Sequence, residues 1–145
     1  MSRDSNFNTT ISIVEDDPGY GSALRQALES REQWRILGPW TSAREAESKL
    51  TSTRSDLILL DINLPDGNGI EIVQQLRAKS VDTPILMLTV LDDAATIVKA
   101  LEAGAQGYLQ KGENGDQIRE AIEDYLAGAA SMSPAIARKL VQWFN

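Results

Sequence analysis

The chain of 145 residues contains no cysteine and no histidine. The lack of cysteine excludes disulfides, zinc–thiolate sites and thiol nucleophiles. The lack of histidine excludes imidazole acid–base catalysis, most transition-metal sites and a phosphohistidine carrier. Basic residues are also few: 14 Lys and Arg stand against 21 Asp and Glu, so the net charge is −7. A chain this acidic offers no basic face to a nucleic-acid backbone. Carboxylates, hydroxyls, lysine and a hard metal ion are left to perform any chemistry.

Long hydrophobic runs are absent as well. No apolar run approaches the ~18 residues that a membrane helix requires, and the N-terminus lacks the pattern of a signal peptide. We therefore expect a cytoplasmic protein that makes no contact with membranes. The length and the apolar content of 42% fit a single domain.

Short apolar runs recur along the chain, and the segments between them have helical periodicity. Successive runs begin about 20–28 residues apart, which is too far for hairpins and suits helical crossovers between parallel strands. The pattern predicts five strands alternating with five helices, in a parallel sheet covered on both faces. The five runs are Ile11–Val14, Ile36–Leu37, Leu57–Leu60, Ile85–Val90 and Gly107–Leu109.

A sixth helical signal follows a stretch of small residues. Ser133 is the expected N-cap, and Ile136, Leu140 and Phe144 share one face of the helix. This face is expected either to pack back on the domain or to add to a dimer. We predict a disordered N-terminus at residues 1–9, one domain at 10–127, and a linker with the start of a connecting helix at 128–145.

Acidic residues follow two of the predicted strands. Glu15, Asp16 and Asp17 come after the first strand, and Asp61 follows the third. Ligands of open parallel sheets bind beyond the carboxyl ends of the strands, where the strand order reverses. If the first and third strands are neighbours, carboxylates about 5 Å apart repel by ~3 kcal/mol at an effective dielectric near 20. A cation relieves that repulsion, and ligands that are all oxygen favour Mg²⁺ before Ca²⁺.

The fourth and fifth strands end in groups that suit an anion. Thr89 offers a hydroxyl and Lys111 an ammonium. Together with Asp61 they could surround a tetrahedral dianion, with the carboxylate as the attacking oxygen that becomes an acyl phosphate. Each residue alone has an ordinary structural explanation, and Asp17 before Pro18 is first of all a helix N-cap. Their coincidence at the same end of four strands favours a site.

Four motifs, in order and at the usual spacing, resemble the receiver domain of bacterial two-component response regulators over about residues 10–127. Residues 128–140 are similar to the linker of regulators that carry a LuxR/NarL-type helix-turn-helix output domain. The resemblance implies an α/β, flavodoxin-like, doubly wound sheet of five parallel strands in the order 2-1-3-4-5. The motifs are Ile13–Asp17, Leu59–Gly69, Pro84–Thr89 and Gly104–Lys111.

The same resemblance implies the roles of the acidic residues. Asp61 is the expected phosphoacceptor. Mg²⁺ is expected to be held by Glu15, Asp16, Asp61 and the backbone carbonyl of Asn63. Glu15 stands where many members have aspartate, so its longer arm is expected to reach the metal through water.

The resemblance also implies a switch. Lys111 is expected to pair with the phosphoryl oxygens, Thr89 to hydrogen-bond one of them, and Tyr108 to be the aromatic switch residue. Two residues depart from the usual pattern. Gly112 replaces a common cis proline, so we expect a trans bond there because a cis bond before a non-proline residue costs ~3 kcal/mol. Val90 is bulkier than the small residue often found beside the threonine.

These motifs predict a domain that takes a phosphoryl group from a sensor histidine kinase and then forms a homodimer. It would perform no turnover beyond its own phosphorylation and dephosphorylation, and its DNA-binding output domain would lie outside this chain. The alternatives are a stand-alone receiver, an inactive receiver, a flavodoxin-like cofactor binder and a Mg²⁺-dependent phosphatase with an aspartyl nucleophile. Such a phosphatase usually needs a second acid two places after the nucleophile, where this chain has Asn63.

Overall fold

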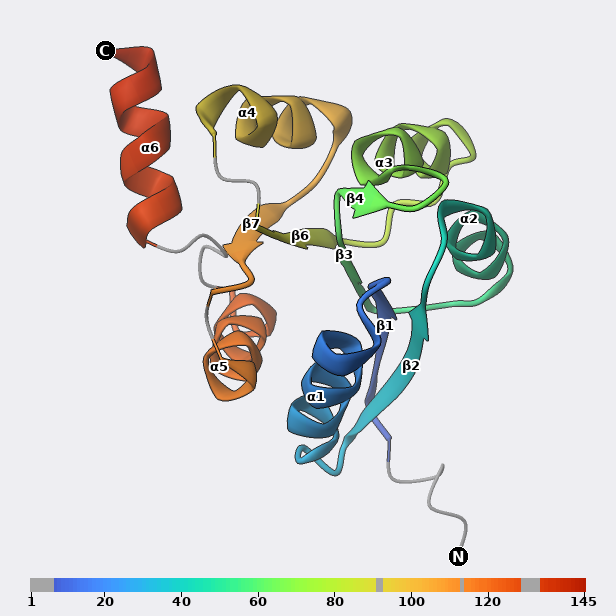
Figure 1. Ribbon diagram of the computed structural model, residues 1–145. Coiled ribbons are helices and arrows are strands. Elements are labelled where there is room, and N and C mark those ends of the chain that lie inside the picture. Colours follow the sequence, from blue (N-terminus) through green and yellow to red (C-terminus); the bar gives the residue numbers. More distant parts are fainter. Residues whose placement is uncertain (1–6, 91–92, 113, 129–133) are drawn as a thin grey trace, which may run out of the picture.

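The computed structural model describes residues 7–90, 93–112, 114–128 and 134–145 (Figure 1). Within them, five strands form one parallel sheet in the order β2-β1-β3-β6-β7, which confirms the predicted order of the five main strands. The sheet lies between helices on both faces (Figure 1). The strands are β1 (Thr9–Val14), β2 (Trp34–Trp40), β3 (Leu57–Leu60), β6 (Ile85–Thr89) and β7 (Gly107–Gln110).

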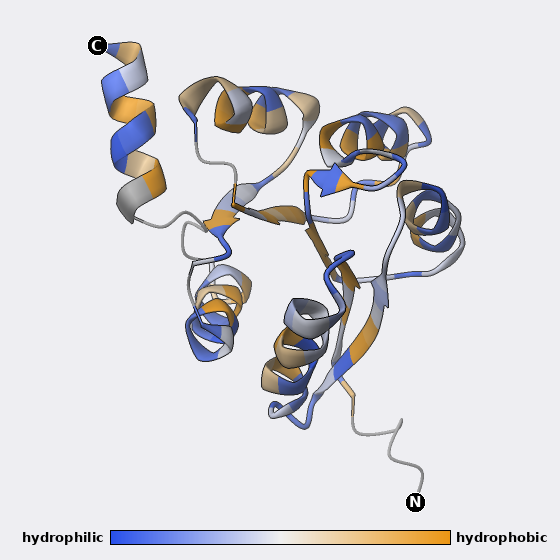
Figure 2. Ribbon diagram, viewed as in Figure 1, coloured by the Kyte–Doolittle hydropathy of each residue, from blue (hydrophilic) through white to orange (hydrophobic). Residues whose placement is uncertain are grey.

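Alternate strand residues face two separate hydrophobic clusters, one on each side of the sheet. On one side α1 and α5 pack against residues such as Ile11 and Leu59. On the other side α2, α3 and α4 pack against residues such as Ile58 and Leu60. Figure 2 shows the apolar strands between these two layers. The helices are α1 (Pro18–Glu29), α2 (Ala43–Ser52), α3 (Gly69–Ala78), α4 (Ala94–Ala103), α5 (Gly115–Leu126) and α6 (Pro134–Phe144).

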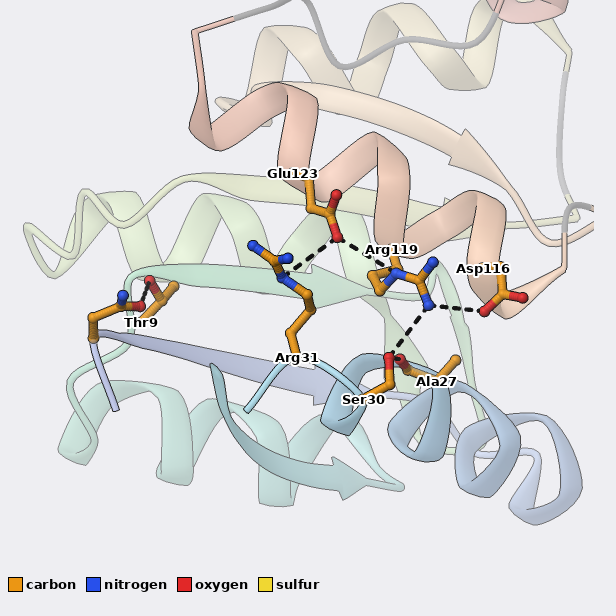
Figure 3. Close-up of polar contacts among 8 residues, drawn as sticks. Thr9, Ala27, Ser30, Arg31, Asp116, Arg119 and Glu123 are labelled. Carbon is orange, nitrogen blue, oxygen red and sulfur yellow. Dashed lines mark hydrogen bonds and ion pairs between the residues drawn. The ribbon is translucent and has the colours of Figure 1, made fainter. Parts of the chain in front are cut away.

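Polar contacts join the end of α1 to α5 at the surface (Figure 3). Glu123 lies 3.5 Å from Arg31 and 3.4 Å from Arg119, and Arg119 also donates to the Ser30 hydroxyl at 3.2 Å. Exposed ion pairs of this kind contribute little, about 0–1 kcal/mol each. The apolar contacts beneath them, which include Leu28 and Ile122, therefore hold this helix pair to the sheet.

A two-stranded hairpin follows the third strand directly. Its strands, β4 (Asn63–Leu64) and β5 (Gly67–Asn68), pair antiparallel. The sequence did not predict them, because strands of two residues are too short to show an alternating pattern. Asn68 ends the hairpin and caps α3 by accepting a hydrogen bond from the backbone N–H of Ile70 at 2.7 Å.

The two ends of the chain bear on the predicted boundaries. Residues 1–6 and the predicted N-cap Ser133 lie outside the described residues. Strand β1 begins at Thr9, one residue before the predicted start of the domain. Within the ranges given above, the helices are too short and too polar for any of them to span a bilayer.

The sixth helix packs back on the domain beside α4 (Figure 1). Ile136 is fully buried in the same cluster as Tyr108 and Ala100, and Leu140 packs against that cluster. Phe144, expected on the same apolar face, is instead 73% exposed. The surface near α4 is therefore covered by Ile136 and Leu140 but not by the last turn of α6.

Candidate functional site

The candidate site lies at the carboxyl ends of the central strands. Strands β1 and β3 are neighbours, and Val14 pairs with Leu60, so the next residues, Glu15 and Asp61, emerge side by side. Both side chains are buried, with exposures of 2% and 4%. The convergence expected from the sequence is confirmed.

A third carboxylate completes an acidic cluster. One oxygen from each of Glu15, Asp16 and Asp61 lies within 4.8 Å of the other two. Asp16 is exposed, so the cluster has a solvent-facing side. Asp17 does not belong to it, because its side chain caps α1 by accepting from the backbone N–H of Tyr20 at 3.1 Å. This geometry fits a hard cation that keeps several waters.

Lys111 joins the two buried carboxylates. Its Nζ donates to Glu15 Oε1 at 2.7 Å and to Asp61 Oδ2 at 2.8 Å, and its side chain is 13% exposed. Glu15 Oε2 lies 2.5 Å from the same Nζ, so both oxygens of this carboxylate contact the ammonium. Two buried carboxylates thus share one ammonium, which leaves negative charge in excess. Buried negative charge in excess is what a bound cation would compensate.

The pKa shifts follow from this shared ammonium. Burial raises the pKa of Glu15, while the hydrogen bonds from Lys111 and from the Asp17 N–H oppose that shift. Burial by itself would lower the pKa of Lys111, but its hydrogen bonds with Asp61 and Glu15 outweigh burial, and the pKa is raised. Lys111 therefore stays a cation at neutral pH.

Tyr20 is a site neighbour that the sequence analysis missed. Its ring centroid lies 5.0 Å from Lys111 Nζ, within reach of a cation–π interaction. The two residues are far apart in the chain, and a tyrosine in the first turn of a helix gives no signal of such a contact.

Gly69, the residue directly after the hairpin, packs closely against the backbone of Asp61. A Cβ on Gly69 would lie 2.1 Å from the Asp61 backbone oxygen, so no other residue fits there without a shift of the backbone. The Gly69 N–H donates to the Ile62 carbonyl at 2.7 Å. Asn63, the expected carbonyl ligand, is the first residue of the hairpin, two positions after Asp61.

The predicted switch residues lie on two neighbouring strands, β6 and β7. Thr89 is fully buried at the end of β6, and its backbone oxygen accepts from the Lys111 N–H at 3.1 Å. Tyr108 is fully buried in the cluster that also contains Ile136, so its ring faces the core on the α4 side. Val90 is 68% exposed. Among the described residues the only cis peptide bond is Gly38–Pro39, so the bond before Gly112 is trans, as expected.

Comparison with known proteins assigns the fold to a family. Residues 11–123 match the model of the response regulator receiver domain. The chain belongs to this family. The receiver domain is 31% identical to the transcriptional regulatory protein LnrK of Bacillus subtilis, over 92% of this chain and 61% of that protein. It is 30% identical to the nitrate/nitrite response regulator NarL of Escherichia coli K12, over 88% of this chain and 59% of that protein.

A solved structure resembles the receiver domain over nearly its whole length. It is a LuxR-family two-component response regulator from Aurantimonas sp. SI85-9A1, with 31% identity and a TM-score of 0.86. The match covers 94% of this chain and 98% of that one. The receiver domain is thus homologous to transcriptional regulators of the LuxR/NarL type. It spans about three fifths of the length of the curated relatives named above.

Proposed function

We propose that this receiver domain is a phosphoacceptor and that Asp61 takes the phosphoryl group. The observation that carries the proposal is the buried Asp61 carboxylate, held 2.8 Å from Lys111 Nζ inside an acidic cluster. An Asp61 oxygen would attack phosphorus while the bond to the histidine nitrogen of a sensor kinase breaks. The products are an acyl phosphate on Asp61 and a neutral histidine on the kinase once that nitrogen has gained a proton.

The acidic cluster fits a divalent ion, as the spacing of its carboxylates and the excess of buried negative charge indicate. We assign Mg²⁺ to Glu15, Asp16, Asp61 and the backbone carbonyl of Asn63. When bound, it would neutralise charge on the phosphoryl oxygens. Lys111 would exchange its hydrogen bond with Asp61 for one with a phosphoryl oxygen.

The switch would start at Thr89. A phosphoryl group on Asp61 offers its hydroxyl a charge-assisted hydrogen bond. Thr89 pairs with Gln110 of β7, and Tyr108 lies two residues before Gln110 on the same strand. Movement of Thr89 would therefore leave space into which Tyr108 can turn. Because Ile136 of α6 lies in the same cluster as Tyr108, repacking there would also reach α6. The signal then appears as a changed surface near α4 and α6.

We infer signalling without substrate turnover. A phosphatase with an aspartyl nucleophile needs an acid–base group two places later, and the Asn63 amide cannot carry a proton. We further propose residues 10–127 as the receiver and 128–145 as its linker, with phosphorylation promoting a homodimer. In the full-length regulator, dimerisation would bring two DNA-binding modules onto paired half-sites.

Intact mass spectrometry tests this function. The protein is incubated with a small acyl phosphate and Mg²⁺, and Asp61→Asn is the matched control. We expect the wild type to gain the mass of one phosphoryl group and the Asp61→Asn variant to gain none. Steady release of inorganic phosphate from many monoesters would support the phosphatase instead.

Sedimentation with and without beryllofluoride tests the dimer. The proposal expects a shift from monomer to dimer when beryllofluoride is added with Mg²⁺. A monomer at every concentration, with and without beryllofluoride, would contradict the dimer and point to release of an inhibited output domain.

A further inference from the structure

The tip of the β4–β5 hairpin is attached to the start of α2. Asp66 lies in the turn, and its Oδ1 accepts from the Ala43 N–H at 2.6 Å while Oδ2 accepts from the Arg44 N–H at 3.0 Å. The first N–H groups of a helix have no partner within the helix. Ser42 satisfies only that of Glu45, at 3.1 Å. Asp66 therefore completes the N-terminus of α2 from outside the helix.

The attachment is close as well as polar. A Cβ on Gly67 would lie 2.9 Å from the Ala43 Cβ, closer than two such atoms normally approach. Glycine at this position thus lets the hairpin sit directly against α2. The hydrogen bonds from Ala43 and Arg44 lower the pKa of Asp66, so the contact is made by a carboxylate at neutral pH.

The root of the hairpin is fixed separately. Gly69 donates to Ile62 at 2.7 Å and approaches the Asp61 carbonyl closely. Asn63 lies between the fixed root and the fixed tip, and it pairs with Asn68 across the hairpin. The tip contact depends on the Asp66 side chain, which lies outside the acidic cluster.

We propose that Asp66 is a positioning residue for the backbone carbonyl of Asn63 and thereby sets the affinity of the site for Mg²⁺. Asp66 does not touch the metal; it holds the hairpin against α2 so that the Asn63 carbonyl stays where it completes the ligand set. This inference rests on the proposed metal site. Outer partners of metal ligands commonly change metal affinity by 10–100-fold when they are removed. Asp66 acts through a hairpin rather than on a ligand side chain. We therefore expect its removal to lower the Mg²⁺ affinity by the low end of this range, about tenfold.

The test is the dependence of the initial phosphorylation rate on Mg²⁺ concentration, with acetyl phosphate as donor. Asp66→Ala removes both acceptor oxygens, and the near-isosteric Asp66→Asn leaves one. The matched control is Asp56→Ala, which removes another carboxylate that accepts a backbone N–H, that of Thr10 at 2.7 Å, outside the site.

We expect the Mg²⁺ concentration at half-maximal rate to rise about tenfold in Asp66→Ala and less in Asp66→Asn. It should not change in Asp56→Ala, and the rate at saturating Mg²⁺ should stay within about twofold of wild type in all three. An unchanged Mg²⁺ dependence in Asp66→Ala overturns the inference, as does a fall in the saturating rate alone. A wild-type protein without Mg²⁺-dependent phosphorylation would instead overturn the proposed function itself.

Discussion

Toward the amino end of the sheet two buried hydroxyls pair with each other, whereas at the carboxyl end two buried carboxylates share one cation. The Ser12 and Ser55 hydroxyls lie 2.5 Å apart and are both buried. At the other end, Glu15 and Asp61 share the single ammonium of Lys111.

The difference separates stability from function. A buried hydroxyl pair contributes on the order of 1 kcal/mol and leaves nothing unsatisfied. Buried charges in excess cost free energy, because desolvation is only partly repaid by the ion pairs that form. A divalent cation would restore the balance, and it would also offset the further negative charge that a phosphoryl group brings to Asp61. The excess of negative charge at the carboxyl end thus favours binding of a cation, whereas the hydroxyl pair contributes to stability.

The largest expected effect is on phosphorylation. Asp16→Ala should abolish Mg²⁺ binding and lower Mg²⁺-dependent phosphorylation by at least about 100-fold, because it removes a ligand of the ion. Since Asp16 is exposed, the free energy of unfolding should hardly change. Titration calorimetry measures the binding of Mg²⁺, and intact mass spectrometry measures phosphorylation. Equal phosphorylation in EDTA and in Mg²⁺ would show that the site is wrongly assigned.

The next effect is on the balance of charge. Lys111→Ala leaves two buried carboxylates unpaired and should lower the free energy of unfolding by about 3 kcal/mol. Mg²⁺ should restore part of this loss, since it replaces the missing cation, and urea unfolding with and without Mg²⁺ measures both changes. The variant should still be phosphorylated but should not dimerise in response. Normal phosphate-dependent dimerisation of the variant would show that Lys111 does not transmit the signal.

A smaller effect is expected toward the amino end. Ser12→Ala leaves the Ser55 hydroxyl buried without its partner and should lower the free energy of unfolding by about 2 kcal/mol. The double variant Ser12→Ala, Ser55→Ala should recover part of that loss. Phosphorylation of Asp61 should be unchanged in both. Loss of phosphorylation in a folded Ser12→Ala protein would contradict the division between the two ends.

The smallest effect concerns pH. The pKa of Asp66 is lowered in the folded state, so its contribution to stability is fully present above the unfolded carboxyl pKa of about 4 and is lost as the pH falls through the folded value. Asp66→Asn should therefore be less stable than wild type at neutral pH, and the gap should narrow below about pH 4. Urea unfolding at pH 7 and pH 3 measures it. A difference in the free energy of unfolding that is equal at pH 7 and pH 3 would contradict a contact made by a charged carboxylate.

The main sheet and the acidic cluster could be predicted because they depend on local signals. Apolar runs mark the strands, and Glu15 and Asp61 directly follow two of them. The strand order itself came from the family resemblance. The periodicity of the sequence predicted that Ile136 lies on the apolar face of α6. It could not predict which surface that face covers, because this depends on the neighbours in the folded chain.

Contacts between distant segments could not be predicted. The attachment of the β4–β5 hairpin to α2 through Asp66 depends on how close two loops come after folding. The placement of the Tyr20 ring near Lys111 depends likewise on how close α1 and the residue after β7 come after folding. Neither has a pattern in the chain, because the partners are separated by many residues.

The most direct measurement of the central claim is the identity of the phosphorylated residue. After reaction with acetyl phosphate and Mg²⁺, borohydride reduces the acyl phosphate, and peptide mapping locates the reduced side chain. The account predicts reduction at Asp61 alone, and none when EDTA replaces Mg²⁺. Reduction at Glu15 or Asp16, or reduction that does not require Mg²⁺, would contradict it.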